Sequence, residues 1–266
     1  MVSPGSVAFT IFGMDVAWYG VLIGFAFLLA GAIAYYRAPR HGVDRDHFLT
    51  LLIWLIPSAL IGARAYYVIF RWDYYSQHLN QIFNTRGGGL AIHGGVILGF
   101  IVAYFVCKYY KEKFFSLADL CCVVLPLAQA IGRWGNFFNE EAHGVETDLP
   151  FAQIIDGVGY HPTFLYESVW CFLLFVFLLW MDSKHRKFDG QITCLYGILY
   201  SFERFFVEGL RTDSLMIGDL RQAQVISIVI FVGGIILYVI LKKYNEAQLL
   251  KAEENSTDEN IEKKES

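Results

Sequence analysis

Long apolar stretches recur along the chain and are separated by shorter polar segments. About seven of them approach the ~20 residues that a helix needs to cross the hydrocarbon core of a membrane. They cover roughly Val16–Tyr36, Phe48–Phe70, Leu90–Tyr110, Leu117–Phe137, Phe164–Met181, Gln191–Val207 and Ala223–Leu241. The pattern predicts an all-α fold, a polytopic membrane helix bundle with about seven transmembrane helices.

The polar segments differ in their content of Lys and Arg. The first, third and fifth connections and the segment after the last stretch are basic, whereas the residues from Asn136 to Ser183 contain neither Lys nor Arg. Cytoplasmic loops carry the excess of basic residues in membrane proteins. We therefore expect a multi-pass chain with its N-terminus outside and its C-terminus in the cytoplasm.

Composition agrees with a chain surrounded by membrane lipid. Charged residues make up 17% and hydrophobic residues 56% of the sequence, whereas a soluble domain carries about 25% charged residues. We expect one transmembrane catalytic domain over residues 1–246, with a small outward head region at about 136–163. Residues 247–266 are rich in Glu, Lys, Asn and Ser, which predicts a disordered cytoplasmic tail. No nucleic-acid partner is expected.

Several ionisable side chains lie inside the apolar stretches, where charge is costly and a functional role is the first hypothesis. With the predicted topology, Arg64, His93, Arg133, Glu167 and Arg204 all fall toward the outward ends of their helices. A shared layer near the outer leaflet is therefore expected.

The segment Gly132–Glu141 is the most informative, because it places Arg133, Asn136, Asn139 and Glu141 within ten residues at the end of a helix. A guanidinium forms forked hydrogen bonds to phosphate oxygens. The two amides are suited to orienting a head group, and the carboxylate to pairing with an arginine or handling a proton. An arginine that merely extends to the interface would not account for its polar neighbours.

The sequence around His93 favours proton transfer, since histidine exchanges protons near neutral pH. A structural histidine inside the bundle is an equally good reading. Gly94, which follows, lets another backbone or a lipid group come close. Glu167 lies one turn inside a helix that starts after Pro162, where an acid is also favoured by the helix dipole alone.

Tyr200, Arg204 and Glu208 follow one another at intervals of four residues and so share a helical face. A salt-bridged solvated face is the usual explanation, but it fits poorly inside an apolar stretch. Tyr19 lies near the outward end of the first helix, where an aromatic side chain often marks the membrane interface.

These segments together resemble the prolipoprotein diacylglyceryl transferase family of bacterial inner-membrane enzymes. The most specific match is Gly132–Glu141, which resembles the family signature G-R-x-G-N-F-x-N-x-E. Supporting matches follow in the family's order: Trp18–Gly20, Gly62–Arg64, His93–Gly95, His161–Glu167 and Tyr200–Arg211. The segment from Gly218 to Ser227 matches only loosely.

The resemblance implies a reaction and its partners. The diacylglyceryl group of phosphatidylglycerol is transferred to the cysteine thiol in the lipobox of a prolipoprotein, a thioether forms, and glycerol 1-phosphate leaves. This is the first step of lipoprotein maturation, in the bacterial plasma membrane, and it needs no metal or soluble cofactor. The family fold is a seven-helix bundle with an outward head.

The implied chemistry assigns roles to the residues above. Arg133 and Arg204 would hold the phosphate, with Tyr200 beside them. Asn136, Asn139 and Tyr19 would fix the glycerol head group. The remaining expected substrate contacts are Arg64, Gly94, Glu167 and Glu208. The thiol needs a base, for which His93 is the first choice, and Glu141 or a bound phosphate oxygen are rivals.

Three other functions use the same residues. A transporter for an anionic lipid or solute would need polar residues reaching both membrane faces, but the cytoplasmic halves of the stretches are almost wholly apolar. An intramembrane hydrolase would need a nucleophile such as Ser201, which lacks a G-x-S-x-G frame. A structural scaffold would not retain so many costly polar groups.

Overall fold

The computed structural model describes residues 1–85, 88–212, 216–218 and 220–265, with side chains described up to residue 253. The chain divides into two compact units, one made of Met1–Ala34 with Cys121–Ser266 and the other of Tyr35–Leu120. Each unit is described by itself below.

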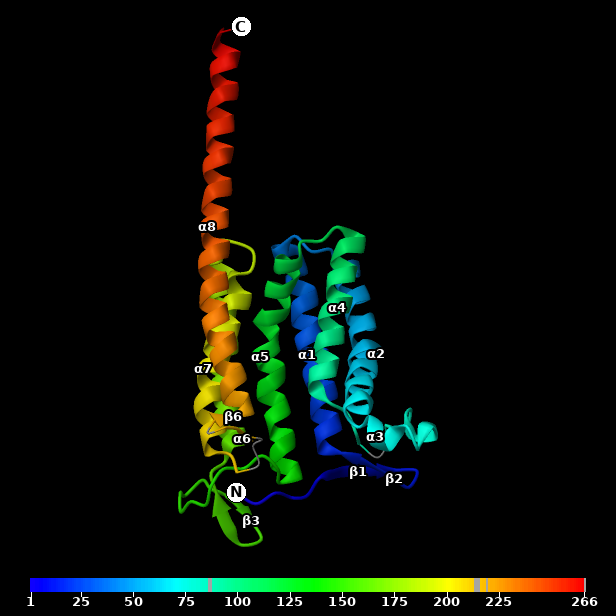
Figure 1. Ribbon diagram of the computed structural model, residues 1–266. Coiled ribbons are helices and arrows are strands. Elements are labelled where there is room, and N and C mark those ends of the chain that lie inside the picture. The colour runs from blue at the N-terminus through cyan, green and yellow to red at the C-terminus, as the bar shows by residue number, and fades with distance from the viewer. Residues whose placement is uncertain (86–87, 213–215, 219, 266) are drawn as a thin grey trace. The chain divides into compact units, whose positions relative to one another are not determined.

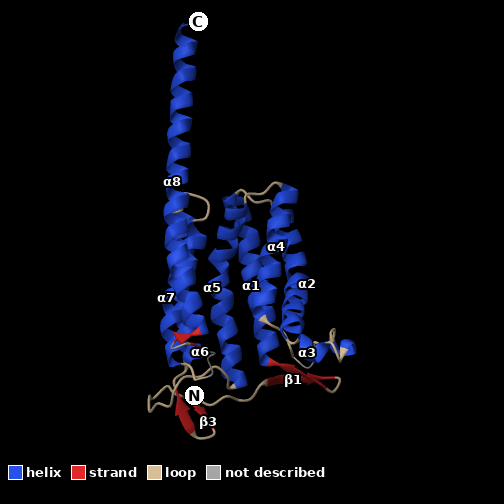
Figure 2. Ribbon diagram, viewed as in Figure 1, coloured by secondary structure: helices blue, strands red, loops and turns tan. Residues whose placement is uncertain are grey.

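Helices dominate the described residues (Figures 1 and 2). The long ones are α1 (Trp18–Arg37), α2 (Arg45–Phe70), α4 (Ile92–Tyr110), α5 (Phe114–Asn139), α6 (Thr163–Lys184), α7 (Gln191–Leu210) and α8 (Gln222–Glu265). Short helical turns are η1 (Ala38–His41), α3 (Trp72–Tyr75) and η2 (Leu79–Gln81). Each predicted stretch therefore corresponds to one long helix, and the all-α membrane fold is confirmed.

Six helices of the described chain are long and apolar enough to cross a membrane, namely all the long helices except α7. Helix α7 has the length of a membrane span but carries Glu203, Arg204 and Glu208 near its C-terminal end. These three charges lower its apolar character, and they belong to the polar site described below. The protein is thus a multi-pass membrane protein in which one long helix is specialised for charged groups.

In the unit of residues 35–120, α2 and α4 lie side by side (Figure 1). They come closest at Gly62 and Gly94, where a Cβ on either glycine would overlap the backbone carbonyl of the other. Small residues allow such backbone contact between membrane helices. At the N-terminal end of α2, the Asp44 carboxylate accepts hydrogen bonds from the backbone N–H of Asp46 (2.7 Å) and His47 (3.4 Å). These bonds hold the pKa of the exposed Asp44 below its ordinary value.

In the other unit, α7 packs against both α6 and α8 (Figure 1). The buried residues of α6 recur every three or four positions, as Glu167, Cys171, Leu174 and Leu178. That spacing forms one helical face, so an apolar buried stripe ends in a single acid near the start of the helix.

Three short antiparallel hairpins, which the apolar pattern did not predict, lie at the ends of helices in this unit (Figure 2). They are β1–β2 (Val7–Ile11, Met14–Ala17), β3–β4 (Gln153–Ile155, Val158–Tyr160) and β5–β6 (Met216–Ile217, Leu220–Arg221). The β3–β4 turn is Asp156-Gly157, and both residues have positive φ, as a tight two-residue hairpin requires. The predicted head region at about 136–163 therefore contains a hairpin.

Helix α8 continues to Glu265, through the tail for which the sequence predicts disorder. Glu, Lys, Ala and Leu in this segment are good helix formers, which agrees with its helical backbone. Residue 266 lies outside the described residues.

Candidate functional site: a carboxylate shared by two arginines

Glu167 is the centre of the site. It is 1% exposed, and each of its carboxylate oxygens faces a different arginine. Nη1 of Arg204 donates a hydrogen bond to Oε1 at 2.9 Å, while Nη2 of Arg133 forms an ion pair with Oε2. The three residues come from α5, α6 and α7, so the site depends on how three helices pack.

The ion pairs continue along α7. Nη2 of Arg204 also contacts Oε2 of Glu208, one turn further on. Nε of Arg211 lies 3.9 Å from the same Glu208 oxygen. Arginine and glutamate thus alternate from Arg133 to Arg211, so every positive charge has a negative neighbour. This alternation lowers the cost of placing charges at membrane depth.

Tyr200 completes the inner part of the site. Its hydroxyl accepts a hydrogen bond from Nη2 of Arg133 at 3.3 Å. The Tyr196 ring stacks on the Tyr200 ring with centroids 5.5 Å apart, an ordinary separation for an aromatic pair. The Tyr196 hydroxyl donates to Oε1 of Gln129 at 3.1 Å. The Tyr200 phenol therefore contacts the Arg133 guanidinium and is itself packed against Tyr196.

Local contacts set the ends of α5 and α6. Nε1 of Trp134 donates to Oγ of Ser168 at 3.2 Å, and Ser168 donates to the carbonyl of Ala130 at 2.9 Å. Thr163, the first residue of α6, donates its hydroxyl to the carbonyl of Ala142. These bonds fix Arg133 on α5 relative to Glu167 on α6.

A second polar group lies where α5 ends. Oε1 of Glu141 accepts hydrogen bonds from Nδ2 of Asn136 at 2.9 Å and Nδ2 of Asn139 at 3.3 Å. Glu140 and Ala142 on either side have positive φ, which turns the chain sharply and returns Glu141 toward the helix. The two amides and the acid of the signature thus form one hydrogen-bonded group.

Tyr19 lies beside this segment. A Cβ at Gly135 would overlap the Tyr19 ring, so the aromatic side chain contacts the bare backbone of α5. The neighbouring Trp18 ring stacks on Phe138 with centroids 5.0 Å apart. The start of α1 is therefore held against the end of α5 by two aromatic contacts.

Glu203 is a buried acid that the sequence analysis did not include among the site residues. It is 6% exposed, and neither of its carboxylate oxygens has a hydrogen-bond partner in the described part of the chain. The charges of Glu167, Arg133 and Arg204 act on it. The burial of Glu203 is evident only from the structure, in which α7 packs between α6 and α8.

Three predicted site residues, Arg64, His93 and Gly94, belong to the unit of residues 35–120. The Arg64 guanidinium donates to backbone carbonyls of Gln81 (2.7 Å), Ile82 (2.7 Å), Gly88 (3.2 Å) and Gly89 (2.8 Å). Through these hydrogen bonds, Arg64 holds the segment after α3 in place. Its contact with substrate stays a prediction.

His93 is the second residue of α4 and is exposed. Its ring centroid lies 6.1 Å from that of Tyr66. The space beside Gly94 is occupied by Gly62 and Tyr66, so a backbone, not a lipid group, is what comes close to this glycine. The roles of His93 as base and Gly94 as a substrate contact stay predictions.

Comparison with known proteins assigns the chain to a family. The family model for prolipoprotein diacylglyceryl transferase matches residues 6–240. The chain belongs to the prolipoprotein diacylglyceryl transferase family. The match includes every signature segment, and the family resemblance predicted from those segments is confirmed.

Relatives in this transferase family are similar over nearly their whole length. A phosphatidylglycerol–prolipoprotein diacylglyceryl transferase of Finegoldia magna is 50% identical over 248 residues, covering 93% of this chain and 98% of the relative. The enzyme of the same name from Clostridioides difficile is 53% identical over 240 residues, covering 90% and 96%. That of Clostridium novyi is 47% identical over 243 residues, covering 88% and 94%.

Proposed function

We propose that this chain transfers the diacylglyceryl group of phosphatidylglycerol to the lipobox cysteine of prolipoproteins. A carbon–sulfur bond forms at the glycerol carbon that carries the phosphate ester, and the carbon–oxygen bond to that phosphate breaks. The phosphate leaves with the bonding electrons as glycerol 1-phosphate, and the thiol proton passes to a base. Membership of the transferase family and the two arginines on Glu167 support this assignment.

The shared carboxylate is the observation that carries the proposal. A thiolate is the reactive form of cysteine, and a phosphate can leave carbon only if its growing negative charge is stabilised. Glu167 holds the guanidiniums of Arg133 and Arg204 on its two sides. Preorganised donors of this kind stabilise developing charge without having to rearrange during the reaction.

The arginines keep donors for a phosphate after binding Glu167. A guanidinium has five N–H donors. In the described part of the chain, Arg133 uses only Nη2, toward Glu167 and Tyr200, which leaves Nε and Nη1 available. The Arg133 side chain is 20% exposed. A phosphate oxygen can therefore reach it while the ion pair with Glu167 stays intact.

The Glu141 group supplies a second set of contacts. Asn136 and Asn139 each use one N–H on Glu141 and keep a second N–H and a carbonyl oxygen. These groups match the hydroxyls of a glycerol head group. Tyr19 would cover the head group from α1. The base is His93, with Glu141 or a phosphate oxygen as alternatives.

Localisation and domain roles complete the proposal. The chain would lie in a bacterial plasma membrane with its N-terminus outside and its C-terminus in the cytoplasm, and residues 1–246 would hold the whole activity. Reporter fusions at each end test the orientation. Removing residues 247–266 should leave the rate within about twofold of the full chain, because the polar composition of this segment is typical of a solvated tail.

The activity test uses the full chain in lipid nanodiscs with head-group-labelled phosphatidylglycerol and a lipobox peptide. We expect a thioether product together with released glycerol phosphate, and no product when the peptide cysteine is replaced by serine. Arg133→Ala should lower the rate by ~10²–10³, whereas the exposed Arg40→Ala should not. Phospholipid movement without thioether formation would instead indicate a transporter.

A further inference from the structure

Glu203 on α7 is a buried acid that the proposed reaction does not use. The residue is buried, and neither of its carboxylate oxygens is reached by solvent or has a hydrogen-bond partner in the described part of the chain. An ionised carboxylate that is buried without a partner is so costly that the group takes up a proton instead. We therefore expect Glu203 to be an uncharged carboxylic acid around neutral pH.

The charges that act on Glu203 come from the site on the two arginines. They belong to Arg133 of α5, Glu167 of α6 and Arg204 of α7. Glu203 in turn acts on the buried thiol of Cys171 on α6. The acid is therefore close enough to the guanidiniums for its own charge to matter to them, although it forms no ion pair with either.

Helix α8, which packs on the other side of α7, brings no charge to Glu203. Between residues 222 and 241 it contains one ionisable side chain, Tyr238, whose ring contacts Phe188 before the start of α7, about three turns away from Glu203. Arg221, just before α8, lies near Gly209, beyond Glu203 in the other direction.

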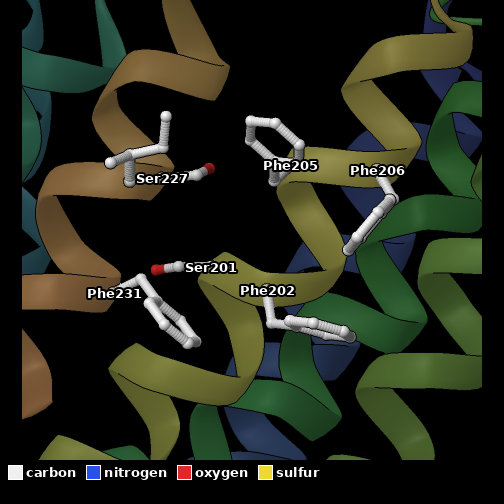
Figure 3. Close-up of a pocket in the computed structure, with 7 residues that line it drawn as sticks. Ser201, Phe202, Phe205, Phe206, Ser227 and Phe231 are labelled. Atoms are coloured by element: carbon white, nitrogen blue, oxygen red, sulfur yellow. The ribbon is translucent and has the colours of Figure 1, made fainter.

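The crevice between α7 and α8 gives no access to Glu203 either (Figure 3). Its α7 wall is formed by Ser201, Phe202, Phe205 and Phe206, and Glu203 is not among the lining residues. A group whose oxygens are inaccessible cannot take a proton directly from a substrate thiol. Glu203 can therefore influence the reaction through its charge, but not by contact.

The two arginines of the site share a single inner carboxylate. Arg133 and Arg204 each carry a positive charge, and both pair with Glu167. Glu208, which also contacts Arg204, has Arg211 as a second partner. The inner group of two guanidiniums and one carboxylate thus has one positive charge in excess, which is equal and opposite to the charge of a phosphodiester.

We propose that Glu203 sets the charge of the donor site: as an uncharged acid it leaves this excess positive charge to the phosphodiester of the lipid, and the loss of its proton cancels the charge. The inference rests on the proposed function and adds to it a residue that controls donor affinity. Because Glu203 touches no reacting atom and acts through Arg133 and Arg204, it is a positioning residue.

The proposal links the binding of the donor to the proton on Glu203. A phosphate that binds better when Glu203 is uncharged must also, by reciprocity, favour the uncharged form. At a pH at which Glu203 is ionised in the empty site, binding of the lipid should therefore be accompanied by uptake of a proton.

The first test measures donor binding to the full chain in maltoside micelles, with short-chain phosphatidylglycerol and no peptide. Wild-type affinity should be constant around neutral pH and fall roughly tenfold at alkaline pH, the effect of one nearby charge at an effective dielectric constant near 20. Glu203→Gln stays uncharged, so it should match wild type at neutral pH and lose less affinity at alkaline pH. Glu203→Asp can still ionise and should behave like wild type.

The matched control is Glu146→Gln, which removes an exposed carboxylate of the head region and should keep the full alkaline loss. Ionisation of Tyr200, which bonds Arg133, is common to wild type and to all these variants. The difference between wild type and Glu203→Gln therefore isolates the charge of Glu203.

The second test counts protons by calorimetric titration in two buffers with different enthalpies of ionisation. At alkaline pH, wild type should take up more protons for each lipid bound than Glu203→Gln, whereas a merely structural role of Glu203 would leave the two counts equal. If Glu203→Gln does not fold, Glu203→Leu gives the same uncharged comparison. Wild-type protein that takes up no protons on binding would by itself overturn the inference.

Two further results would overturn it. One is an equal alkaline loss of affinity in wild type and Glu203→Gln. The other is tighter binding by Glu203→Gln at neutral pH, which would mean that Glu203 is already ionised there.

Failure of the proposed function gives a different result, because these titrations contain no peptide. If wild-type protein forms no thioether when the lipobox peptide is added, the proposed function is wrong, and the lipid titrations still decide the role of Glu203. If the thioether forms but Glu203→Gln binds lipid like wild type at every pH, the proposed function stands and the role of Glu203 is wrong.

Discussion

Replacing Glu167 by glutamine tests the centre of the site with almost no change in shape. The amide keeps one oxygen but loses the negative charge that faces Arg133 and Arg204. The two guanidiniums would then repel each other across a neutral group. We expect both a less stable protein and a slower reaction.

The magnitude follows from the contacts. Two unit charges about 4 Å apart interact by about 4 kcal/mol at an effective dielectric constant near 20, and Glu167 makes two such pairs. Part of this is offset by the desolvation of a carboxylate that is 1% exposed. Removing one partner of a buried pair costs roughly 3–5 kcal/mol. A guanidinium displaced by about 1 Å costs ~10² in rate.

The assay measures thermal unfolding and thioether formation on the same nanodisc preparations. Glu146→Gln is the matched control, because Glu146 is an exposed glutamate in the head region. Combining Glu167→Gln with Arg204→Gln should cost less than the sum of the two single changes, since the second change removes an uncompensated charge. The reasoning is refuted if Glu167→Gln unfolds and reacts like the control.

Other positions give sharper single-residue tests. Gly135→Ala should displace Tyr19, whose ring contacts the glycine, and raise KM for the lipid, whereas Gly24→Ala, with nothing within 4 Å of its Cβ, should be neutral; equal KM values would contradict this. Glu141→Gln should lower kcat/KM roughly tenfold by weakening two charge-assisted bonds, and an unchanged value would remove Glu141 from the site. His93→Gln should abolish one limb of the pH–rate profile, and if both limbs persist, another group is the base.

The long helices were predictable from the sequence because a helix that crosses a membrane needs a long stretch of apolar residues. Stretches such as Phe48–Phe70 are apolar over the full length that the bilayer requires. The helices end within a few residues of the predicted limits, except α8, which continues well past Leu241 to Glu265. The hairpins were missed because they are only two to five residues per strand. The Asp156-Gly157 pair was a local sequence signal that could have predicted the β3–β4 hairpin.

The residues of the site could be predicted from the sequence, but their arrangement in space could not. Helical spacing placed Arg204 and Glu208 together, because both lie on one helix. It could not show that Glu167 is shared between Arg133 and Arg204, since that depends on how three helices pack. Spacing also did not point to Glu203, although packing buries it. An acid within an apolar stretch was the available signal for Glu203.

The backbone contact of α2 with α4 affects how mutational scans of this scaffold are interpreted. Any side chain placed at Gly62 or Gly94 would wedge the two helices apart and tilt the start of α4, where His93 lies. An inactive Gly94 variant would therefore report a distorted helix pair just as well as a lost ligand contact. Substitutions that reshape exposed side chains while sparing the glycines are the ones that can map substrate on this part of the chain.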